Sequence, residues 1–415
     1  MNNETKKGKL VPELRFPGFE EEWPIQPLSN FLHEHKTKSD GKSRVHSVSV
    51  SKGVVDQVEY LGRSFAASDT SKYNLAKPND IIYTKSPTGS FPYGIVKMNK
   101  KPYNVIVSPL YGVYSPTNKY IGYILDSYFE SPERTNTYLS TLIQKGAKNT
   151  IQITNSTFIS KNVCFPTDEA EQQKIAECLS SVDNLIQAEA DQLQALKDHK
   201  KGLMQQLFPQ EGETTPKLRF PGFEGEWEEK KLGEVGETVS GLTYSPSNVS
   251  NDGSGLLVLR SSNIKNGMLC FDDNVYVQSI KKYNPVKEND ILICVRNGSS
   301  SLIGKNALIP IGLSAAFGAF MMVFRTNQWS FVFQLLQTET YSKQIEQNLG
   351  ARINSINRED FKNYEFFFPS TPEEQQKIAE CLSSLDEGIA AQQEKVEALK
   401  EHKKGLMQKL FPTIN

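Results

Sequence analysis

Apolar residues recur at alternating steps of four and three positions in two stretches of the chain, each about 40 residues long. A period of about 3.5 residues is typical of a helix that pairs with another along a coiled-coil seam. Phe208-Pro209 and Phe411-Pro412 are expected to end the helices, because proline cannot continue a helix. The residues predicted to pair the helices are Ile175, Leu179, Val182, Ile186, Leu193 and Leu196 in the first, and Ile378, Leu382, Leu385, Ile389, Val396 and Leu399 in the second. Polar residues interrupt the seam at Glu189, Lys200, Gln392 and Lys403.

Both stretches begin with residues suited to start a helix. Asp168 is suited to cap the first, with Glu171 at the third helical position as in a capping box. Thr371 is suited to cap the second, followed by Pro372 at the first helical position. The pattern therefore predicts two similar long helices with defined starts and ends.

Each predicted helix needs a partner for its seam, and its copy in the same chain is the obvious one. Antiparallel pairing would put the two preceding segments at opposite ends of a rod roughly 60 Å long, related by a pseudo-two-fold axis. A coiled coil that joins two chains is the alternative. Two seams in one chain, each after a large insert, favour the intramolecular pair.

Short strand-like runs fill the segments before the helices. Val45–Val50 and Ile81–Tyr83 lie in the first segment. Leu256–Leu259 and Ile291–Val295 lie in the second, and an Asn-Asp pair precedes the later run of each segment, which indicates a common fold. We expect twisted, partly barrel-like sheets with a few helices, for example over residues 328–349. The predicted fold class is α+β: two globular, mixed, strand-rich domains separated by two long helices packed as an antiparallel coiled coil.

Three blocks of sequence occur twice. They are LRFPGFE at 14–20 and 218–224, each followed by a tryptophan (Trp23 and Trp227); EQQKIAECLSS at 171–181 and 374–384; and HKKGLMQ at 199–205 and 402–408. Two nearly identical frames therefore hold two different inserts, the layout of one scaffold that reads two unlike targets. The predicted organisation is an N-terminal segment 1–23, a first insert domain 24–166, a central helix 167–210, a linker 211–227, a second insert domain 228–369 and a C-terminal helix 370–415.

The net charge of −1 hides an uneven distribution. Residues 24–166 hold 17 lysines and arginines against 9 acidic residues, whereas residues 228–369 hold 14 of each. Phosphate binding needs local basic patches rather than a basic total. The first insert therefore satisfies this requirement directly, and the second depends on local clustering.

The composition also indicates the cellular compartment of the protein. No apolar run approaches the length of about 18 residues that spans a membrane, and the first residues do not resemble a signal peptide, so we expect a soluble, cytoplasmic protein without membrane partners. The five cysteines form no Cys-x-x-Cys pair. Cys178 and Cys381 occupy equivalent repeat positions, and we interpret them as reduced core residues rather than as a disulfide or metal site.

Polar loops near the strand-like runs carry the chemistry suited to DNA. Arginine can bind guanine and asparagine can bind adenine through paired hydrogen bonds, while hydroxyls and lysines can hold phosphates. An ordinary solvated role fits each residue alone, but loops at matched positions of two inserts favour a shared binding role. The candidates are Lys36, Lys38, Lys42, Arg44, Lys52, Lys85, Ser86, Thr88, Lys148 and Asn149 in the first insert, and Arg296, Asn297, Ser299, Ser300, Lys305, Arg352 and Asn354 in the second.

Catalytic motifs are not evident. The chain has neither a phosphate-binding Walker loop nor a Gly-x-Gly-x-x-Gly loop. Residues 283–286 differ from the Asn-Pro-Pro-aromatic loop of adenine methyltransferases. His33 and His35 would point to opposite sides of a strand, which disfavours a metal site. Asp198 and Lys200 resemble a nuclease pair but would lie about 200° apart around a helix. We therefore expect no catalytic centre.

The chain resembles the specificity subunits of type I restriction-modification enzymes. The resemblance covers nearly its whole length and is carried by the LRFPGFE openings, the duplicated helices with EQQKIA and HKKGLMQ, and the two dissimilar inserts. It implies a non-catalytic protein that binds double-stranded DNA, in which each insert reads one half of a bipartite, asymmetric site. Two methyltransferase subunits and restriction (motor-nuclease) subunits are the implied partners. S-adenosylmethionine, ATP and Mg²⁺ would belong to those partners, and no cofactor to this chain.

Two other classes of function remain open from the sequence. A coiled-coil adaptor would organise protein partners without nucleic acid. An enzyme would transfer methyl groups by itself and would bind S-adenosylmethionine as an isolated chain. Exchanging residues 24–166 for another insert would change a DNA motif only if the chain reads DNA.

Overall fold

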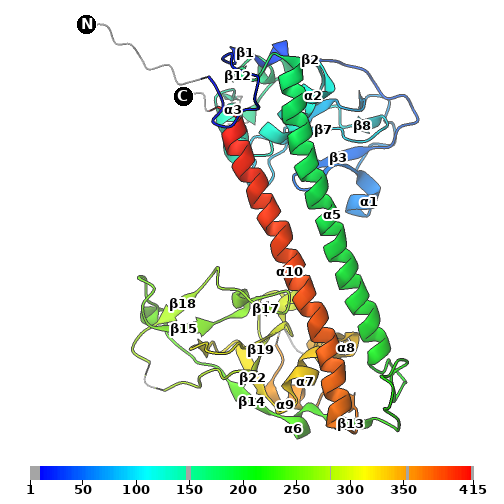
Figure 1. Ribbon diagram of the computed structural model, residues 1–415, viewed down its shortest axis with the longest axis vertical. Coiled ribbons are helices and arrows are strands. Elements are labelled where there is room, and N and C mark those ends of the chain that lie inside the picture. The colour runs from blue at the N-terminus through cyan, green and yellow to red at the C-terminus, as the bar shows by residue number, and fades with distance from the viewer. Residues whose placement is uncertain (1–9, 146–150, 281, 352–354, 413–415) are drawn as a thin grey trace. The chain divides into compact units, whose positions relative to one another are not determined.

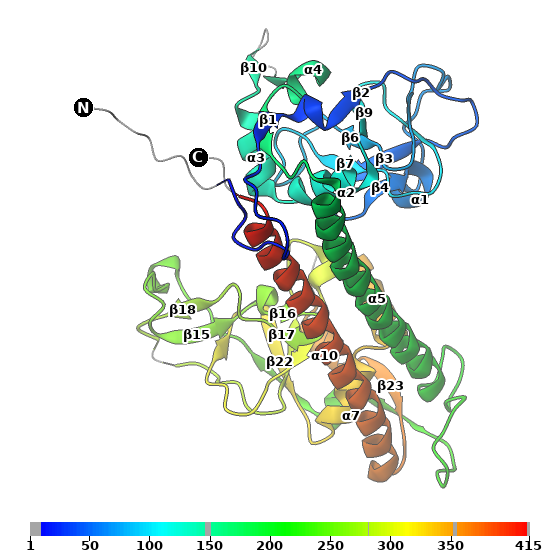
Figure 2. The ribbon, with the colours of Figure 1, turned by 45° about the horizontal axis from the view of Figure 1, so that its top comes forward.

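The computed structural model describes residues 10–145, 151–280, 282–351 and 355–412. The chain divides into two compact units: unit 1 comprises Met1–Ala190 with Glu394–Asn415, and unit 2 comprises Asp191–Gln393. Two 39-residue helices, α5 (Glu169–Leu207) and α10 (Pro372–Leu410), each contribute one part to each unit (Figure 1, Figure 2). Within the described residues, every helix is too short or too polar to cross a bilayer.

Short strands and helices make up the globular part of unit 1. The strands are β1 (Ile25–Pro27), β2 (Leu32–Glu34), β3 (His46–Ser49), β4 (Gly53–Asp56), β5 (Asn74–Ala76), β6 (Ile81–Tyr83), β7 (Val96–Met98), β8 (Val105–Val107), β9 (Gly112–Pro116), β10 (Gln144–Lys145), β11 (Ile151–Gln152) and β12 (Asn162–Cys164). The helices are η1 (Leu28–Asn30), α1 (Gln57–Leu61), α2 (Lys119–Tyr128), α3 (Pro132–Ser140) and α4 (Asn155–Phe158).

The central sheet of unit 1 has four antiparallel strands in the order β2-β9-β6-β7. Strand β6 consists of three buried residues, Ile81 to Tyr83, because it lies in the middle of the sheet and is covered on both faces. Helix α2 packs against β7 and β9. Its N-cap is Asn118, whose side chain accepts a hydrogen bond from the backbone N–H of Ile121.

The globular part of unit 2 has a similar make-up. The strands are β13 (Glu228–Lys231), β14 (Glu237–Ser240), β15 (Leu256–Leu259), β16 (Ile264–Lys265), β17 (Met268–Leu269), β18 (Val275–Val277), β19 (Ile291–Cys294), β20 (Asn306–Leu308), β21 (Ala316–Phe317), β22 (Met321–Arg325) and β23 (Glu365–Phe368). The helices are α6 (Leu232–Val235), η3 (Pro246–Asn248), η4 (Ser261–Asn263), η5 (Ser300–Leu302), α7 (Trp329–Leu335), α8 (Glu339–Ala351) and α9 (Arg358–Lys362).

The central sheet of unit 2 repeats the topology of unit 1, with antiparallel strands in the order β14-β22-β19-β20. Ile291 pairs with Phe324 in unit 2 as Ile81 pairs with Tyr114 in unit 1. Each residue of 79–116 therefore corresponds, without a gap, to the residue 210 positions later. This register confirms the common fold that the repeated Asn-Asp pair indicated.

The Asn-Asp pair is a turn that leads into the central strand of each sheet. Asn79 and Asn289 adopt left-handed backbone angles, with φ of 70° and 64°. Asp80 and Asp290 are buried, and each carboxylate accepts the backbone N–H three residues before it at 2.7 Å. Asparagine tolerates the left-handed region and aspartate closes the turn, which explains why both residue types recur here.

The two long helices pair antiparallel inside each unit, as predicted. The hydrophobic core of unit 1 joins the start of α5 to the end of α10 through Ile175, Leu179, Met407, Leu410 and Phe411. The core of unit 2 joins the end of α5 to the start of α10 through Met204, Leu207, Phe208, Ile378 and Leu382. All of the predicted pairing residues are buried or half-buried, so the periodicity identified the correct helix faces.

The repeated blocks bind one another. Arg15 donates two hydrogen bonds to the carboxylate of Glu171, at 2.7 and 3.0 Å, and the indole N–H of Trp23 donates a third at 3.0 Å. Arg219 donates to Glu374 in the same way, at 2.8 and 2.7 Å. Both carboxylates are buried. The LRFPGFE block is therefore the ionic partner of the EQQKIA block, and this contact explains why the two blocks recur together.

The predicted cap of the first long helix is confirmed, but one predicted helix is divided in two. Asp168 caps α5 by accepting the backbone N–H of Ala170 at 2.7 Å. Residues 328–349, expected as one helix, form α7 and α8 instead. The chain restarts at Thr338, whose hydroxyl accepts the backbone N–H of Tyr341 at 3.3 Å and caps α8. Among the described residues the strands form separate open sheets of two to four strands, where partly barrel-like sheets were expected.

All five cysteines are free thiols. Cys178 and Cys381 are only half-buried, however, because they flank the helix seam rather than lie in it. Cys164 and Cys294 are the buried thiols, and burial raises the pKa of each to about 11.

Candidate nucleic-acid interface

The sequence-predicted candidates of unit 1 that the structure describes all lie on exposed loops. They are Lys36, Lys38, Lys42 and Arg44 between β2 and β3, Lys52 in the turn between β3 and β4, and Lys85, Ser86 and Thr88 after β6. Lys148 and Asn149 lie outside the described residues. The polar groups of the described candidates are therefore accessible to a large ligand.

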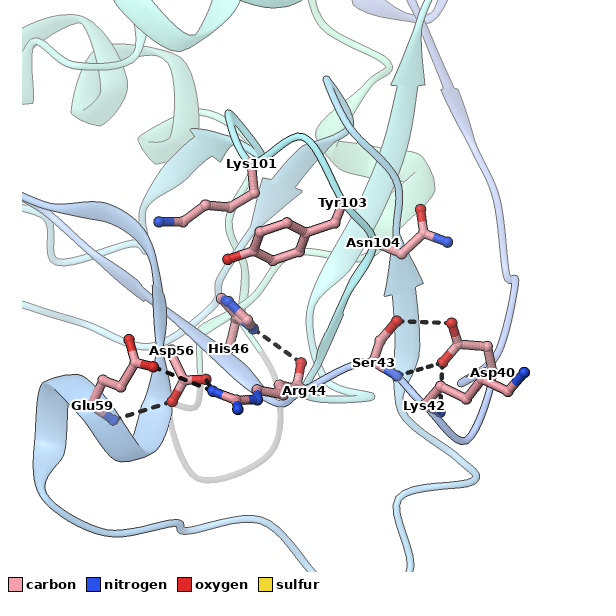
Figure 3. Close-up of a pocket in the computed structure, with 10 residues that line it drawn as sticks. All are labelled: Asp40, Lys42, Ser43, Arg44, His46, Asp56, Glu59, Lys101, Tyr103 and Asn104. Carbon is pink, nitrogen blue, oxygen red and sulfur yellow. Dashed lines mark hydrogen bonds and ion pairs between the residues drawn. The ribbon is translucent and has the colours of Figure 1, made fainter.

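A pocket of about 510 Å³ opens beside the β2–β3 loop (Figure 3). Lys42, Arg44 and Lys101 line it together with Asp56 and Glu59. Arg44 is 75% exposed, and its guanidinium lies 3.6 Å from Asp56 and 3.3 Å from Glu59. These carboxylates offset part of the positive charge of Arg44, so the pocket is a weaker phosphate site than the sequence suggested.

Asp40 gives the same loop a fixed shape. Its carboxylate accepts the backbone N–H groups of Ser43 and Lys42, at 2.8 and 3.0 Å, and the hydroxyl of Ser43 at 2.8 Å. These hydrogen bonds, that of the Ser43 backbone first, hold the pKa of Asp40 at about 2. The turn therefore presents Lys42 from an ordered backbone (Figure 3).

Two further lysines of unit 1 are influenced by their neighbours. Lys38 donates to the side-chain oxygen of Asn74 at 2.7 Å and to the carbonyl of Lys72 at 3.2 Å. Partial loss of surrounding water lowers the pKa of Lys85, and nearby Glu34 opposes that shift. Lys38 is thus positioned by the fold rather than free to swing in solvent.

In unit 2 the candidates gather between β19 and β20, at the position equivalent to the loop after β6. They are Arg296, Asn297, Ser299, Ser300 and Lys305; all are exposed except Asn297, which is half-buried. Arg352 and Asn354 lie outside the described residues. The structure therefore brings a cation and several hydroxyls together on one exposed loop.

The side chains of this loop have distinct tasks. The guanidinium of Arg296 lies over the exposed ring of Phe320, 5.8 Å from its centroid. Asn297 donates to the hydroxyl of Ser261 at 2.9 Å and accepts the backbone N–H of Ser299 at 3.0 Å. Each end of the Asn297 amide thus makes one hydrogen bond within the protein, so this residue helps to shape the loop. Arg296 retains the chemistry for a base or a phosphate.

A second pocket of about 510 Å³ lies beside the Arg296 loop, and sequence reasoning missed it. Tyr244, Phe320 and Met321 give it an apolar wall, and Arg260, held by Asp273 at 2.8 Å, gives it a polar one. These residues come from separate loops of unit 2. No local sequence pattern could have joined them.

One of the two histidines noted in the sequence, His35, has a structural explanation. The Nε2 atom of His35 lies 2.8 Å from the buried carboxylate of Asp80, so His35 supports the Asn-Asp turn. Over the described ranges, no three histidine, cysteine or acidic side chains are grouped to hold a metal ion. The exposed groups of both loops are those of a binding surface.

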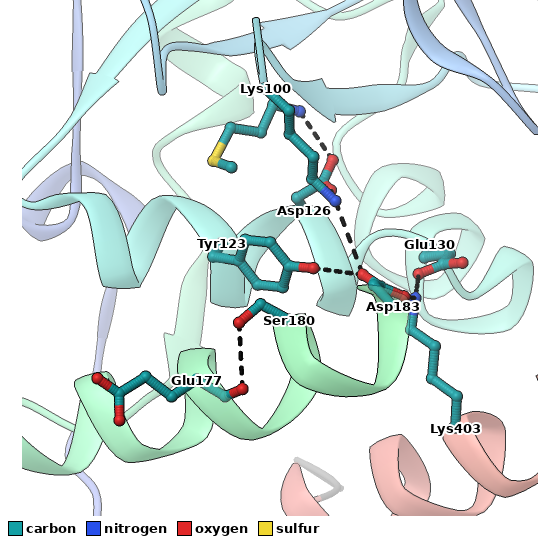
Figure 4. A network of polar contacts seen from close by, with 9 residues as sticks. Lys100, Tyr123, Asp126, Glu130, Glu177, Ser180, Asp183 and Lys403 are labelled. Carbon is teal, nitrogen blue, oxygen red and sulfur yellow. Dashed lines mark hydrogen bonds and ion pairs between the residues drawn. The ribbon is translucent and has the colours of Figure 1, made fainter. Parts of the chain in front are cut away.

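Polar residues that interrupt the helix seam tie the helices to the domains that carry these loops. In unit 1, the ammonium of Lys403 on α10 binds Asp183 of α5 at 2.6 Å and also Glu130, which follows α2 (Figure 4). Tyr123 of α2 donates to Asp183, and Lys100 lies 3.8 Å from it. Burial opposes the charge of Lys403, but the two carboxylates outweigh it and raise its pKa.

Unit 2 contains the matching contact. Lys200 of α5 binds both carboxylate oxygens of Asp386 on α10, at 2.6 and 2.7 Å. Gln334 of α7 donates to the same carboxylate at 2.8 Å. Lys200 and Lys403 occupy the same place in the HKKGLMQ repeat. Each ion pair therefore fixes the helix register and anchors a globular region to the helices.

Comparison with known proteins identifies the family. The family model of the type I restriction modification DNA specificity domain matches residues 51–198 and 224–401. The chain belongs to this family. Each matched stretch contains the strand β6 or β19 of one of the two equivalent sheets and the exposed loop that follows it.

Related proteins support this assignment. The chain is 28% identical over 267 residues to the MjaVIII specificity subunit of a type I restriction enzyme from Methanocaldococcus jannaschii, covering 61% of this chain and 62% of the relative. It is 29% identical over 167 residues to the EcoKI specificity subunit from Escherichia coli K12, covering 38% and 36%. The matches thus span less than two thirds of the length of these relatives.

A solved structure shows the same fold. The crystal structure of the S subunit of a type I restriction-modification system from M. genitalium aligns over 98% of this chain and 100% of that chain, with a TM-score of 0.62 and 15% identity. At this identity the likeness concerns the fold alone.

Proposed function

We propose that this chain is the non-catalytic specificity subunit of a type I restriction-modification enzyme. The observation that carries the proposal is the double match to the DNA specificity domain family, with one match to each unit and one exposed polar loop, after β6 or β19, in each matched stretch. Two related units with different loops suit a DNA site made of two different halves. S-adenosylmethionine, ATP and Mg²⁺ would then be bound by partner subunits.

Each unit would read one half-site from its own loops. In unit 1, Lys38, Lys42 and Lys85 supply cations for phosphates. In unit 2, Arg296 can take the O6 and N7 atoms of guanine, and Ser299 and Ser300 can bind phosphate or base edges. Because the loops differ, the half-sites would differ.

The long helices would set the spacing between the half-sites and offer a surface to two methyltransferase subunits and, through them, to restriction subunits. Successive major grooves on one face of a duplex lie roughly 34 Å apart, a distance that a helix of 39 residues can bridge. Work on chromosomal or incoming DNA would place the chain in the cytoplasm.

The proposal is tested by the methylation pattern that the chain directs. The full chain is assembled with its methyltransferase subunits, and the methylated DNA is read by single-molecule sequencing. A bipartite motif with adenine methylated in each half is expected. Exchanging residues 24–166 for the first insert of another family member should change one half of that motif only. Absence of any motif, or an exchange that changes protein partners alone, would contradict the proposal.

Arg296→Ala gives a residue-level test of the same idea. Loss of a two-fold hydrogen-bonded guanine contact should weaken binding of the assembled complex by about 1–3 kcal/mol and relax the motif at one base pair. Lys362→Ala is the control, because Lys362 pairs locally with Glu359 on α9. If the two variants bound DNA equally well, Arg296 would not be part of the interface.

A further inference from the structure

Two bulky apolar side chains stand exposed at equivalent positions of the two units. Leu110 in unit 1 is 74% exposed, and Phe320 in unit 2 is 58% exposed. They lie 210 positions apart, the offset that relates the two central sheets without a gap. The sequence did not single out either residue.

Both side chains project from the same kind of tight turn. The backbone N–H of Tyr111 donates to the carbonyl of Ser108 at 3.0 Å, and that of Met321 donates to Gly318 at 2.9 Å. Each turn leads directly into a central strand, β9 or β22. The exposed residue is the third residue of its turn in each case, so a rigid backbone holds it outward.

Single exposed apolar residues are common and need no explanation. The occurrence of such a residue at the same position of both units does need an explanation, because the surrounding sequences have diverged. Of the 38 aligned residues from Asn79 to Pro116, only six are identical to their counterparts in unit 2. They are Asn79, Asp80, Ile81, Ser90, Gly94 and Val113. A large apolar side chain has nevertheless been kept at an exposed turn in both units.

In each unit a positioned cation lies beside the turn. In unit 1, Asn74 donates to the carbonyl of Tyr111 at 3.0 Å and accepts from Lys38 at 2.7 Å. In unit 2, the guanidinium of Arg296 lies over the ring of Phe320, and the backbone N–H of Arg296 donates to the Phe320 carbonyl at 3.2 Å. Each turn thus combines an outward apolar group with a cation.

We propose that Leu110 and Phe320 each make an apolar contact with a base in the half-site that their unit reads. The inference rests on the proposed function and names a contact within it. Apolar side chains meet DNA bases in two ways: against the methyl group of thymine in the major groove, or wedged between stacked base pairs. Both uses need a rigid, protruding apolar group, and a neighbouring cation helps to hold the DNA against it.

The test uses the full chain assembled with methyltransferase subunits and a duplex that carries the motif found by sequencing. Leu110→Ser and Phe320→Ser should each weaken specific binding about ten-fold or more. The dependence of affinity on salt should stay the same, since no phosphate contact is lost. Leu110→Met and Phe320→Leu should keep most of the affinity. Each serine variant should relax the motif in one half only.

Ile311→Ser is the matched control. Ile311 is 80% exposed in unit 2 but lies outside the paired turns, and its counterpart in unit 1 is Lys101. This variant should bind like the natural chain. A loss equal to that of Phe320→Ser would mean that any exposed apolar residue contributes, which overturns the inference.

Two DNA probes distinguish the kinds of contact. If the side chain contacts thymine methyl groups, replacing the thymines of the half-site with uracil should lower the DNA affinity of the unmodified chain. The affinity of the serine variant should not change. If the side chain is wedged between base pairs, the fluorescence of 2-aminopurine placed in the half-site should increase when the unmodified chain binds. It should not increase when the serine variant binds. A natural chain that directs a bipartite motif while both serine variants bind equally well overturns the inference alone. A natural chain that directs no motif contradicts the proposed function itself.

Discussion

Buried carboxylates of the repeated frame are held by cations from distant parts of the sequence. Glu171 lies 156 positions after Arg15, and Glu374 lies 155 positions after Arg219. A buried carboxylate without a partner is costly, because the low polarity around it does not replace hydration. Either block of a pair would therefore be destabilising without the other.

Arg15→Ala should lower the stability of unit 1 by about 2–4 kcal/mol, because it leaves Glu171 buried with only the Trp23 N–H as a side-chain donor. Thermal denaturation of the full chain, with hydrogen exchange to locate the loss, measures the effect. Glu20→Gln, an exposed change in the same block, should alter stability by less than about 0.5 kcal/mol. Equal effects of the two variants would show that the ion pair does not hold the block.

Residue-level features differ in how far the sequence reveals them. The Asn-Asp turns were visible, because asparagine and aspartate have specific uses in turns. The partner of Glu171 was not visible, since nothing local points to Arg15. Leu110 and Phe320 would have been aligned by counting from the two Asn-Asp pairs, but exposure depends on the whole fold.

Among the elements, the long helices were predictable, and so were several short strands: the runs expected at 81–83, 256–259 and 291–295 are β6, β15 and β19. Helices α5 and α10 repeat their apolar pattern over 39 residues, so the correct faces emerged from the spacing alone. How these strands pair was not predictable, because a run such as β6 has three buried residues and no alternation to mark an inner and an outer face. The seam interruptions were visible, but the ion pair between Lys200 and Asp386 depends on the antiparallel register.

Asp386→Ala should weaken the helix pairing in unit 2 by about 1–3 kcal/mol, because Lys200 remains nearly buried without its carboxylate. The double variant Lys200→Leu with Asp386→Leu should recover much of this loss, since it removes both charges. Urea unfolding measures both. Glu387→Ala, at the exposed neighbouring position, is the control. If the double variant were as unstable as Asp386→Ala, the loss could not be explained by an unpaired buried charge, and this prediction would be wrong.

The helix α2 carries a pH-dependent anchor. Asp126 is buried; burial alone would raise its pKa, but the charge of Lys100 at 2.8 Å and the backbone N–H of Met98 at 2.7 Å outweigh burial and lower it. A carboxyl group with a lowered pKa stabilises the fold above its ordinary value near 4 and loses that contribution as pH falls through the folded-state pKa.

Asp126→Asn should therefore cost unit 1 about 1–2 kcal/mol at neutral pH, and the difference from the natural chain should shrink below about pH 4. Urea unfolding at a series of pH values, read for unit 1, measures this. Glu133→Gln, at an exposed position of unit 1, serves as the control. A difference that widens towards acid would reverse the sign of the argument.

At the scale of the whole molecule, the duplicated frame makes the two helix ends interchangeable. The core of unit 1 receives Met407, Leu410 and Phe411 from α10. The end of α5 offers Met204, Leu207 and Phe208 in the same sequence context. A second copy of α5 could therefore occupy the place of α10.

A chain that ends at Phe208 should consequently form a dimer in which each α5 completes the partner copy. Light scattering coupled to size exclusion should report twice the mass of the shortened chain. With methyltransferase subunits, the shortened chain should direct a palindromic motif built from the half-site of unit 1. Introducing Leu179→Asp into the shortened chain should abolish the dimer, because Leu179 is fully buried in the seam. A monomeric shortened chain would contradict this prediction.

The pairing of Arg15 with Glu171 and of Arg219 with Glu374 has a genetic consequence. Both of these contacts join blocks that are written twice in the chain, so a crossover of genes inside EQQKIAECLSS joins two parental halves without disturbing either contact. Recombination between the genes of related chains can thus place a foreign insert among repeated blocks that already fit one another.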